Sequence, residues 1–486
     1  MKRSKYSLSY YNLLAAPMGY IVPIGLTEVL AGDTIKHHTS ALIRLNAMVH
    51  PVMHPLKVTV HHWFVPHRLV WEDWEDFITG GGDGMDDSVL PYFEDAAVTE
   101  GSCHNFLGVT PGYTGKFSAL PMRGLNLIFN EWYRDQDLVS ERAISLASGL
   151  DNTTAVSLPR ASWLKDYFST ARPWTQKGPD VTIPMALTAP LQSNGQSPTM
   201  RTLTDSFNRT LGLESSTGYV QSQVGAPSMS EAGLWGSESG LEANLSDTPG
   251  GINELRLAFA LQRYEEARAR YGSRYTEYLR YLGVKSSDAR LQRPEYLGGG
   301  KSTIQFSEVI ATAEGTNVDV GDLKGHGIGS MQSNKYVRFF EEHGYVHTYM
   351  HVQPIPVYAQ GMDRTYFRES KEDFFQKELQ YIGQQEVYRK ELYAIGNPTQ
   401  VFGYQDRYAE YRQGRNRVSG KFFDTNKDWH MARIFAEGPT LNSSFVESNP
   451  TMRIFADQTQ EPLQIMAKHS LKARRLVGPG GKSFVL

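Results

Sequence analysis

The segment from Pro51 to Phe77 constrains the fold more than any other part of the chain. Residues 56–65 are strand formers, and side chains on a strand alternate between its two faces. The two faces carry Val58, Val60 and Phe64 on one side and Thr59, His61 and Trp63 on the other. Pro66 has no backbone donor and ends the strand, and residues 69–77 then show near-helical spacing of apolar side chains. We predict a strand in the wall of the β structure and, after it, a short aromatic helix that folds back onto the strand. This is a structural unit rather than a reactive one.

Glycine and proline divide the rest of the chain into many short segments. The 486 residues include 44 Gly and 24 Pro, which favours an all-β sandwich or barrel over a helical protein. The formal net charge is only -3, so any nucleic-acid role must rest on local patches. Cys103 is the only cysteine, which excludes an intramolecular disulfide and a cysteine-based zinc site. No apolar run is long enough to span a membrane.

The chain has three regions that differ from a compact core. Residues 1–20 read as a basic and tyrosine-rich arm rather than a signal peptide. Residues from about 186 to 250 are rich in Ser, Thr, Gly, Gln and Asn, and a loop this long is usually functional or disordered; we interpret it as one inserted excursion. Residues from about 468 to 486 read as a basic tail. We therefore expect a single domain, 1–486, carrying an arm, an insertion and a tail.

Local patterns predict the elements between these regions. Residues 20–30 read as a strand that contains Pro23, hence an edge or bulged strand. Helical spacing is expected over residues 120–150, 253–271 (with Asn253 as the cap) and 275–282. Strands are expected at 304–311, 336–340 and 345–358, and a turn at GHGIGS, 325–330.

Two clusters resemble metal sites, and each has a simpler interpretation. His343, His347 and His351 would share one face of a strand, where they could bind zinc or copper; a polar stripe at a surface or interface is favoured. Asp83, Asp86 and Asp87 could hold calcium, but EF-hand spacing is absent and a solvated acidic loop is favoured. Neither GxSxG nor HExxH occurs, so we predict no catalytic residue, no metal and no cofactor.

Two groups of residues are candidates for binding surfaces. Residues 404–417 interleave aromatics with arginines, which favours a subunit interface over nucleic acid. The interface candidates are Tyr404, Arg407, Tyr408, Tyr411 and Arg412. The basic ends of the chain are predicted to face DNA phosphates, the alternative being frayed ends or a clasp on a neighbouring subunit. These candidates are Lys2, Arg3, Lys5, Lys468, Lys472, Arg474, Arg475 and Lys482.

Several long stretches resemble the major capsid proteins of the Microviridae, in their gokushovirus-like branch. They are LTEVLAGDT at 26–34, VPHRLVWEDWEDF at 65–77, DYFSTARPWTQKGPDVTIP at 166–184, DARLQRPEYLGG at 288–299, IGQQEVYRKELYA at 382–394 and FGYQDRYAEYR with NRVSGKF at 402–422. The insertion lies outside these stretches. RQGRNR at 412–417 departs from the family's usual continuation, which leaves the local contact there open.

The resemblance implies a mainly β fold, an eight-stranded antiparallel jelly roll with long loop insertions and a few short helices. It implies a T=1 icosahedral shell around circular single-stranded DNA of a tailless bacteriophage, found in the virion and assembled in the host bacterial cytoplasm. The expected partners are further copies of the chain, the DNA, a DNA pilot protein, an internal scaffolding protein, a small basic packaging protein and a host surface receptor reached by the insertion. No membrane partner is implied. The alternative from the residues alone is a jelly-roll carbohydrate-active enzyme or lectin-like module.

Overall fold

The computed structural model describes most of the chain. The described residues are 3–94, 98–181, 191–193, 199–202, 208–213, 220–222, 232–233, 241–243, 252–272, 274–310, 312 and 321–478, with side chains described outside 182–252. The chain divides into two compact units, one formed by Met1–Thr175 with Tyr271–Leu486 and the other by Gln176–Arg270. Each is described by itself below.

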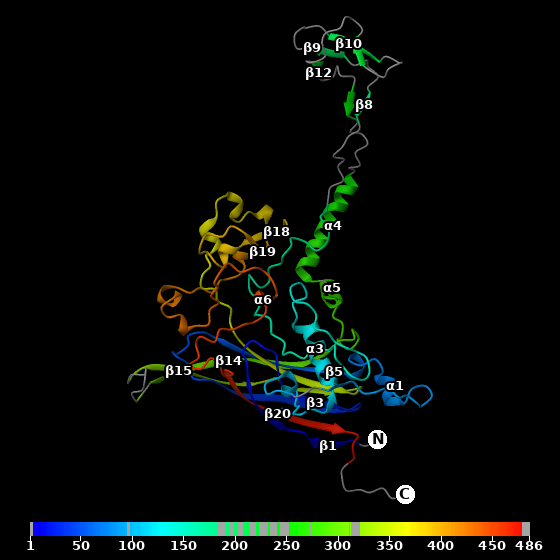
Figure 1. The fold of residues 1–486 in the computed structure, drawn as a ribbon, viewed down its shortest axis with the longest axis vertical. Helices are drawn as coiled ribbons and strands as arrows, with labels where there is room; N and C mark the ends of the chain where they lie inside the picture. Colours follow the sequence, from blue (N-terminus) through cyan, green and yellow to red (C-terminus); the bar gives the residue numbers. More distant parts are fainter. Residues whose placement is uncertain are drawn as a thin grey trace. The chain divides into compact units, whose positions relative to one another are not determined.

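A ten-stranded antiparallel sheet dominates the first unit, and eight of its strands form one hydrogen-bonded path. In path order these are β1 (Ser4–Ser7), β20 (Leu463–Arg475), β4 (Thr34–Leu45), β15 (Leu323–Gln332), β14 (Glu295–Ile310), β5 (Leu56–Pro66), β17 (Gly344–Pro354) and β3 (Val22–Val29). Beside this path, β2 (Tyr10–Ala16) pairs with β20 and β16 (Tyr336–Phe339) pairs with β4. Figure 1 shows β1, near the start of the chain, next to β20, near its end. The predicted mainly β, jelly-roll-like fold is confirmed.

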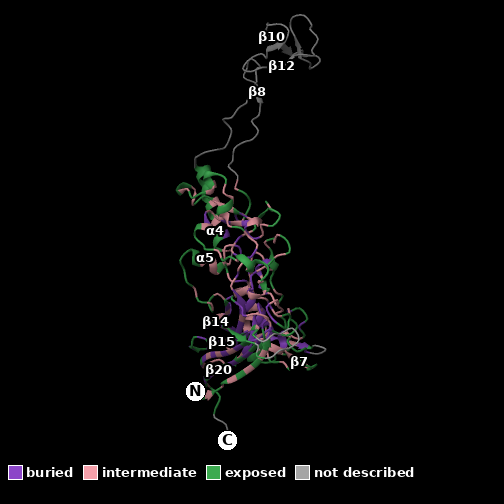
Figure 2. Ribbon diagram, turned by 90° about the vertical axis from the view of Figure 1, so that its left-hand side faces the viewer, coloured by how far each residue is buried: buried purple, intermediate pink, exposed green. Residues whose placement is uncertain are grey.

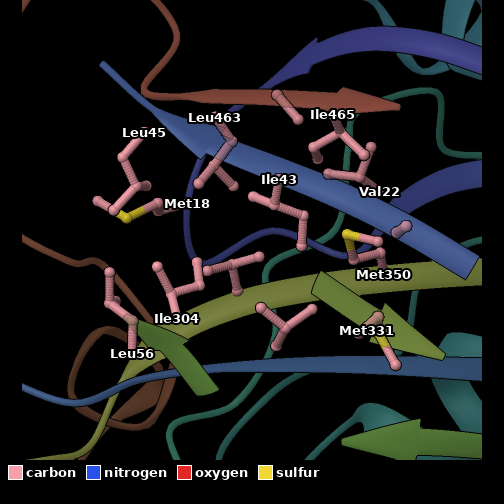
Figure 3. Packing of buried hydrophobic residues seen from close by; sticks show 14 of the residues in the cluster. Met18, Val22, Ile43, Leu45, Leu56, Ile304, Met331, Met350, Leu463 and Ile465 are labelled. Carbon is pink, nitrogen blue, oxygen red and sulfur yellow. The ribbon is translucent and has the colours of Figure 1, made fainter. Parts of the chain in front are cut away.

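Alternation of side chains makes these strands one wall of a core. In β4 and β20, buried residues alternate with exposed or half-buried ones along almost the whole strand. The inward residues join one apolar cluster with residues of the other strands, among them Ile43, Ile465, Val22, Ile304 and Met350. Figure 2 shows buried residues gathered in the main sheet, and Figure 3 shows these side chains pointing into the space between the strands. Burying this apolar surface is what stabilises the curled sheet.

Side chains close the sheet where its two ends meet. The β2–β20 end of the path lies against β3, although no backbone ladder joins them. Instead, Tyr10 Oη donates to the Leu26 carbonyl at 3.4 Å, and Asn12 Nδ2 donates to the Ile24 carbonyl at 3.2 Å. These bonds give partners to carbonyls of an edge strand, and the Ile24 carbonyl also lies 3.0 Å from His469 Nε2.

The strand β3 is both an edge strand and a bulged one, as Pro23 predicted. It pairs only with β17, and the register shifts where Thr348 faces Gly25 and Tyr349 faces Pro23. Ile24 is the extra residue at this shift, and its side chain is fully buried in the core. A proline is tolerated here because one side of the strand needs no ladder donor.

A second cluster surrounds the segment from Pro51 to Phe77. After β5 come η1 (His67–Leu69) and α1 (Trp74–Thr79), which confirm the predicted turn back onto the strand. Trp63 and Trp71 are buried, and they pack in one cluster with α3 (Leu120–Ile128). A π-helical turn, η2 (Phe129–Tyr133), follows α3.

The helix predicted over residues 120–150 is wrong beyond Tyr133. Arg134 is extended, and Asp135 next accepts a bond from the Asp137 amide and pairs with Lys165. Asp side chains that bond to nearby backbone compete with helical bonding, which explains the early end.

The turn predicted at GHGIGS, 325–330, is also wrong, because this segment lies within β15. Gly325 and Gly329 face the core, where an added Cβ would lie 2.7 Å from the His50 carbonyl and 2.9 Å from Ile304. These glycines serve close packing rather than chain reversal. Likewise, residues 468–475, expected as the start of a tail, belong to β20 in the sheet.

The remaining elements of the first unit are short. They are α2 (Cys103–Phe106), β6 (Tyr92–Glu94), β7 (Lys116–Ser118), α5 (Tyr275–Tyr281), β18 (Gln384–Tyr388), β19 (Val401–Asp406), α6 (Ser443–Val446) and the 3-10 turns η5 (Arg364–Phe367), η6 (Lys371–Asp373), η7 (Lys377–Leu379), η8 (Arg389–Glu391), η9 (Ala409–Tyr411), η10 (Gly420–Phe423) and η11 (Lys427–Trp429). A third cluster, including Phe168 and Phe402, supports the segment around β18 and β19.

The second unit holds short strands in two small sheets. They are β8 (Leu191–Ser193), β9 (Thr199–Thr202), β10 (Asn208–Leu213), β11 (Val220–Ser222), β12 (Ala232–Gly233) and β13 (Leu241–Ala243). The helix α4 (Ile252–Tyr271) confirms the predicted helix, but the predicted cap is wrong, because Asn253 lies within the helix rather than before it. Apart from these short strands, the predicted insertion, about 186–250, consists of residues outside those described.

Candidate nucleic-acid interface

The predicted basic residues that the structure describes lie mainly on one face of the sheet. Arg3 directly precedes β1, Lys5 lies in β1, and Lys468, Lys472 and Arg474 lie in β20. All five are exposed, and in β20 they alternate with buried apolar residues. Lys2 and Lys482 lie outside the described residues.

Strand register sets cations directly opposite one another on this face. Lys5 faces Arg474 across the β1–β20 pair, and Lys472 faces Lys36 across the β20–β4 pair. Like charges directly opposite in a sheet are destabilising. An anion bound between these side chains would therefore reduce the repulsion between their charges.

A third lysine adds to this pair. The pKa of Lys335, which precedes β16, is lowered because its ammonium interacts at close range with that of Lys36, and more weakly with that of Lys472. All three side chains belong to exposed residues, so the crowding is not forced by burial. Such a cluster suits the oxygens of a phosphate group.

Acidic residues are absent from this part of the sheet. The strands β1, β2, β4, β15, β16 and β20 contain no Asp or Glu. Lys36, Arg44 and Lys335 belong to the resulting cationic face, although they were not among the residues predicted from the basic ends of the chain. A usable signal was present, since Lys36 and Arg44 occupy alternate, outward positions of an acid-free strand.

Arg475 was predicted among the DNA-facing residues, but the structure places its side chain elsewhere. Its side chain turns away from Lys472 and Arg474, pairs with buried Asp33 at 2.9 Å and donates to the Glu28 carbonyl at 2.5 Å. Because strand side chains alternate, neighbouring arginines 474 and 475 cannot both face outward. Arg475 fastens β20 to the start of β4 instead.

Buried histidines lie directly beneath the cationic face. His37 and His469 occupy the inward positions between Lys36 and His38 and between Lys468 and Ser470. The ring of His62, from β5, lies 4.7 Å from that of His37. Burial lowers the pKa of His37 to about 3 and of His469 to about 4, so these rings add no charge at neutral pH.

The five predicted interface residues divide into exposed and buried ones. Tyr411 and Arg412 are exposed, Arg407 is half-buried, and Tyr404 is half-buried with its backbone paired to that of Arg172. Tyr408 is only 3% exposed, and its hydroxyl accepts from the Gln376 amide and donates to the Glu372 carbonyl. Tyr408 therefore cannot contact a neighbouring subunit; it is a core residue of this loop region.

The two possible metal clusters do not converge. His347 is fully buried and bonds to the Tyr349 hydroxyl at 2.9 Å, whereas His343 packs near Trp74 and His351 near His61. Asp83 and Asp86 bond to the local backbone of residues 85 and 88. Within the part of the chain that the structure describes, no group of three His, Cys, Asp or Glu residues could hold a metal ion. No helix there is long and apolar enough to cross a bilayer.

Comparison with known proteins gives the class. A family model described as "Capsid protein (F protein)" matches residues 1–477. The chain is 36% identical over 478 residues to capsid protein VP1 of Bdellovibrio phage phiMH2K, which covers 92% of this chain and 88% of the relative. It is 30% identical to the proteins of the same name from Chlamydia phage 1 and Spiroplasma virus 4, each over 92% of this chain and 90% and 88% of the relative.

The fold and these matches define a structural capsid protein of a phage virion, not an enzyme. Such a protein works by assembling with further copies of itself. More particularly, the chain belongs to the F capsid protein family of the Microviridae.

Proposed function

We propose that this chain forms a T=1 icosahedral shell that encloses circular single-stranded DNA, with the cationic face turned toward the genome. The observation that carries this proposal is the direct opposition of Lys36 and Lys472 on acid-free strands. Uncompensated cations at that spacing are stabilised by phosphate, and release of counterions from the DNA favours the contact without reading base sequence.

The whole chain carries a formal charge of only -3, so the face must act locally. Neutralising an entire genome requires more cations than this face provides. A small basic packaging protein is therefore the partner we propose for the remaining phosphates.

Contacts between copies are proposed to involve the exposed aromatics near the predicted interface residues. Phe374, Phe375, Tyr381 and Tyr411 are 50–81% exposed. Arg368, itself nearly buried, holds two of them in place, with its guanidinium 5.3 Å from the Phe374 ring and 4.7 Å from the Tyr411 ring. Rigid exposed aromatics next to arginines are typical of interface hot spots.

The remaining roles follow from the family rather than from described contacts. We propose that the insertion at about 186–250 forms a protrusion that attaches to a host surface receptor, as part of the single domain 1–486. A DNA pilot protein and an internal scaffolding protein are proposed as further partners, with assembly in the host bacterial cytoplasm.

The test separates assembly from packaging. The full chain is produced during phage growth, and particles are examined by sedimentation, negative-stain microscopy and DNA content. We expect Lys36→Gln/Lys472→Gln particles to be closed shells with less protected DNA, and Tyr381→Ser/Tyr411→Ser to reduce shell formation. Val309→Ser/Ile310→Ser, at an exposed apolar pair elsewhere in the sheet, is the matched control. Normal DNA content in the lysine variant would refute the proposed role of the face.

A further inference from the structure

A surface rich in tyrosine lies on the first unit at residues 275–290, which include α5. Its large apolar side chains are 44–65% exposed, and they are Tyr275, Tyr278, Tyr281, Leu282 and Val284. All residues of this segment are described, and its exposed charges are the cations Arg280, Lys285 and Arg290. Its two acids, Glu277 and Asp288, are half-buried and already accept hydrogen bonds within the subunit. Exposed aromatic rings beside arginines are typical of protein interfaces, and this segment is termed the tyrosine surface.

A second exposed surface has the opposite charge. It comprises α1 and the glycine-rich loop after it, residues 72–90, and is termed the acidic lobe. It carries Asp or Glu at positions 72, 73, 75, 76, 83, 86 and 87 and contains no Lys or Arg. Its large apolar side chains are 37–81% exposed, and they are Phe77, Ile78, Met85, Val89 and Leu90. The acidic lobe is therefore more than a solvated acidic loop, because it also exposes apolar side chains that water does not favour.

The exposed charges of both surfaces have no partner of opposite sign within the part of the subunit that the structure describes. Glu72, Asp87, Arg280 and the other exposed charges of these surfaces form no ion pair with another described residue. The two surfaces nevertheless begin next to each other. Arg68 shortly precedes the acidic lobe, and its guanidinium donates to the side chain of Gln292, shortly after the tyrosine surface.

Adjacent and complementary surfaces on one chain suit a twofold contact between copies. In such a contact the same surfaces of both copies take part, and every pair of contacting residues occurs twice. A half-turn about an axis between the two surfaces sets the acidic lobe of each copy against the tyrosine surface of the other. A different partner with one charged surface would compensate either the acids or the cations, whereas a second copy compensates both.

We infer that two copies of this chain join through these surfaces, with the acidic lobe of each copy on the tyrosine surface of the other. Side chains such as Met85 and Tyr281 then leave water, which stabilises the contact, while the charges set the orientation of the copies. This inference rests on the proposed icosahedral shell, which has twofold axes between its subunits, and it names the surfaces that meet there.

Charge reversal tests the contact. Glu72→Lys/Asp87→Lys reverses part of the acidic lobe, and Arg280→Glu/Lys285→Glu reverses part of the tyrosine surface. Each variant is produced as the full chain during phage growth, and closed shells are quantified by sedimentation and negative-stain microscopy. Either variant alone should lower the yield of shells by about tenfold or more, because like charges then face each other across the contact.

Producing the two variants together in one cell should restore shells, because a copy of one kind can then pair with a copy of the other. Repulsion within a single chain would not be relieved by this mixing. Glu308→Lys/Glu437→Lys makes the same change of charge at exposed acids elsewhere and should assemble normally. Normal shells from either variant alone, or no recovery on mixing of variants that circular dichroism shows to be folded, would overturn the inference.

Wild-type particles separate this inference from the proposal beneath it. The absence of closed shells in the wild type would refute the proposed shell itself. Wild-type shells whose yield is insensitive to both charge reversals would refute the twofold contact alone.

A second measurement leaves every charge in place. Cys103 is 2% exposed and burial raises its pKa to about 12, so the native thiol is unreactive. Chains with Met85→Cys and chains with Leu282→Cys are produced in one cell, and the shells are treated with a short bismaleimide. We expect crosslinked dimers that contain one chain of each kind. Crosslinks between like chains alone, or no crosslinks, would contradict the inference.

Discussion

His37 Nε2 lies 3.2 Å from His469 Nδ1, inside the core and directly beneath the lysines of the cationic face. His469 Nε2 faces the Ile24 carbonyl at 3.0 Å, and since a carbonyl only accepts, this nitrogen carries the proton. His469 Nδ1 is then an acceptor, and the donors within reach of it are His37 Nε2 at 3.2 Å and the Thr39 hydroxyl at 3.0 Å; His37 Nδ1 lies 3.1 Å from the Tyr336 hydroxyl. These contacts join β16, β4 and β20 to β3, and protonating both rings would place two N–H donors against each other.

Acid is therefore expected to destabilise the subunit. In the unfolded chain a histidine takes up a proton below about pH 6.5. In the fold, burial holds the pKa of His37 at about 3 and of His469 at about 4. Between about pH 6.5 and 4 the unfolded state binds more protons, so stability falls as pH falls, by ~1.4 kcal/mol per pH unit for each such histidine. Urea unfolding of the full chain at pH 7, 6 and 5 measures this slope.

Variants identify the source of that slope. His37→Gln should lower stability at pH 7, by about 1–3 kcal/mol for the unsatisfied partners, and should make the pH dependence shallower. His326→Gln, at an exposed position of β15, should leave the slope unchanged. An unchanged slope in the His37 variant would mean that other groups cause the acid sensitivity.

Trp71 is expected to be among the most costly aromatic residues to remove. Its ring is fully buried, and its Nε1 donates to Ser148 Oγ at 2.7 Å. Trp71→Ala should lower stability by about 3–5 kcal/mol, and Trp63→Ala by a similar amount. Trp74 is only partly buried, so Trp74→Ala should cost less. Equal melting temperatures for wild type and all three variants would exclude the aromatic cluster as core.

The ion pair of Arg123 and Asp151 is a second buried element to test. Nε of Arg123 lies 2.8 Å from Asp151, both side chains are fully buried, and the guanidinium also donates to the carbonyls of Val70 and Ala147. Asp151→Asn should lower stability by about 3–5 kcal/mol because it leaves a buried charge without its partner. Asp424→Asn, which breaks the exposed pair with Lys427, should cost under ~1 kcal/mol. Thermal unfolding of both variants gives the comparison, and equal small losses would contradict the prediction.

Deleting residues 193–247 should leave a soluble, folded first unit. The deleted residues belong to the second compact unit, Gln176–Arg270, whereas the strands of the main sheet belong to the first. Loops outside a core tolerate such changes. Circular dichroism and melting temperature test the fold, and sedimentation tests whether shells still form. Insolubility of the deletion variant would show that the segment is needed for folding.

Local signals predicted half of the strands of the main sheet, namely β3, β5, β14, β16 and β17, and few of the boundaries. Alternation identified β5, and Pro23 identified β3 as an edge, because both effects act within a few residues. The glycines of β15 gave a false turn, since a buried strand that needs close backbone approach looks the same as a loop. The helix ends at Tyr133, just before Asp135 bonds to the nearby Asp137 amide; the pair of Asp135 with Lys165 adds a contact that no local pattern contains.

The candidate site likewise combines features that local sequence predicts and features that depend on contacts between distant residues. The mainly β character of the chain, its membership of a phage capsid protein family and the gathering of cations near both chain ends can be read from the amino-acid order. The fold is needed to show that β4 lies beside β20, so that Lys36 faces Lys472 and Leu13 faces Met466, while Arg475 turns inward to Asp33. The physical reason is that strand pairing joins residues far apart in sequence, and a shift of one residue in register would exchange the buried and exposed faces.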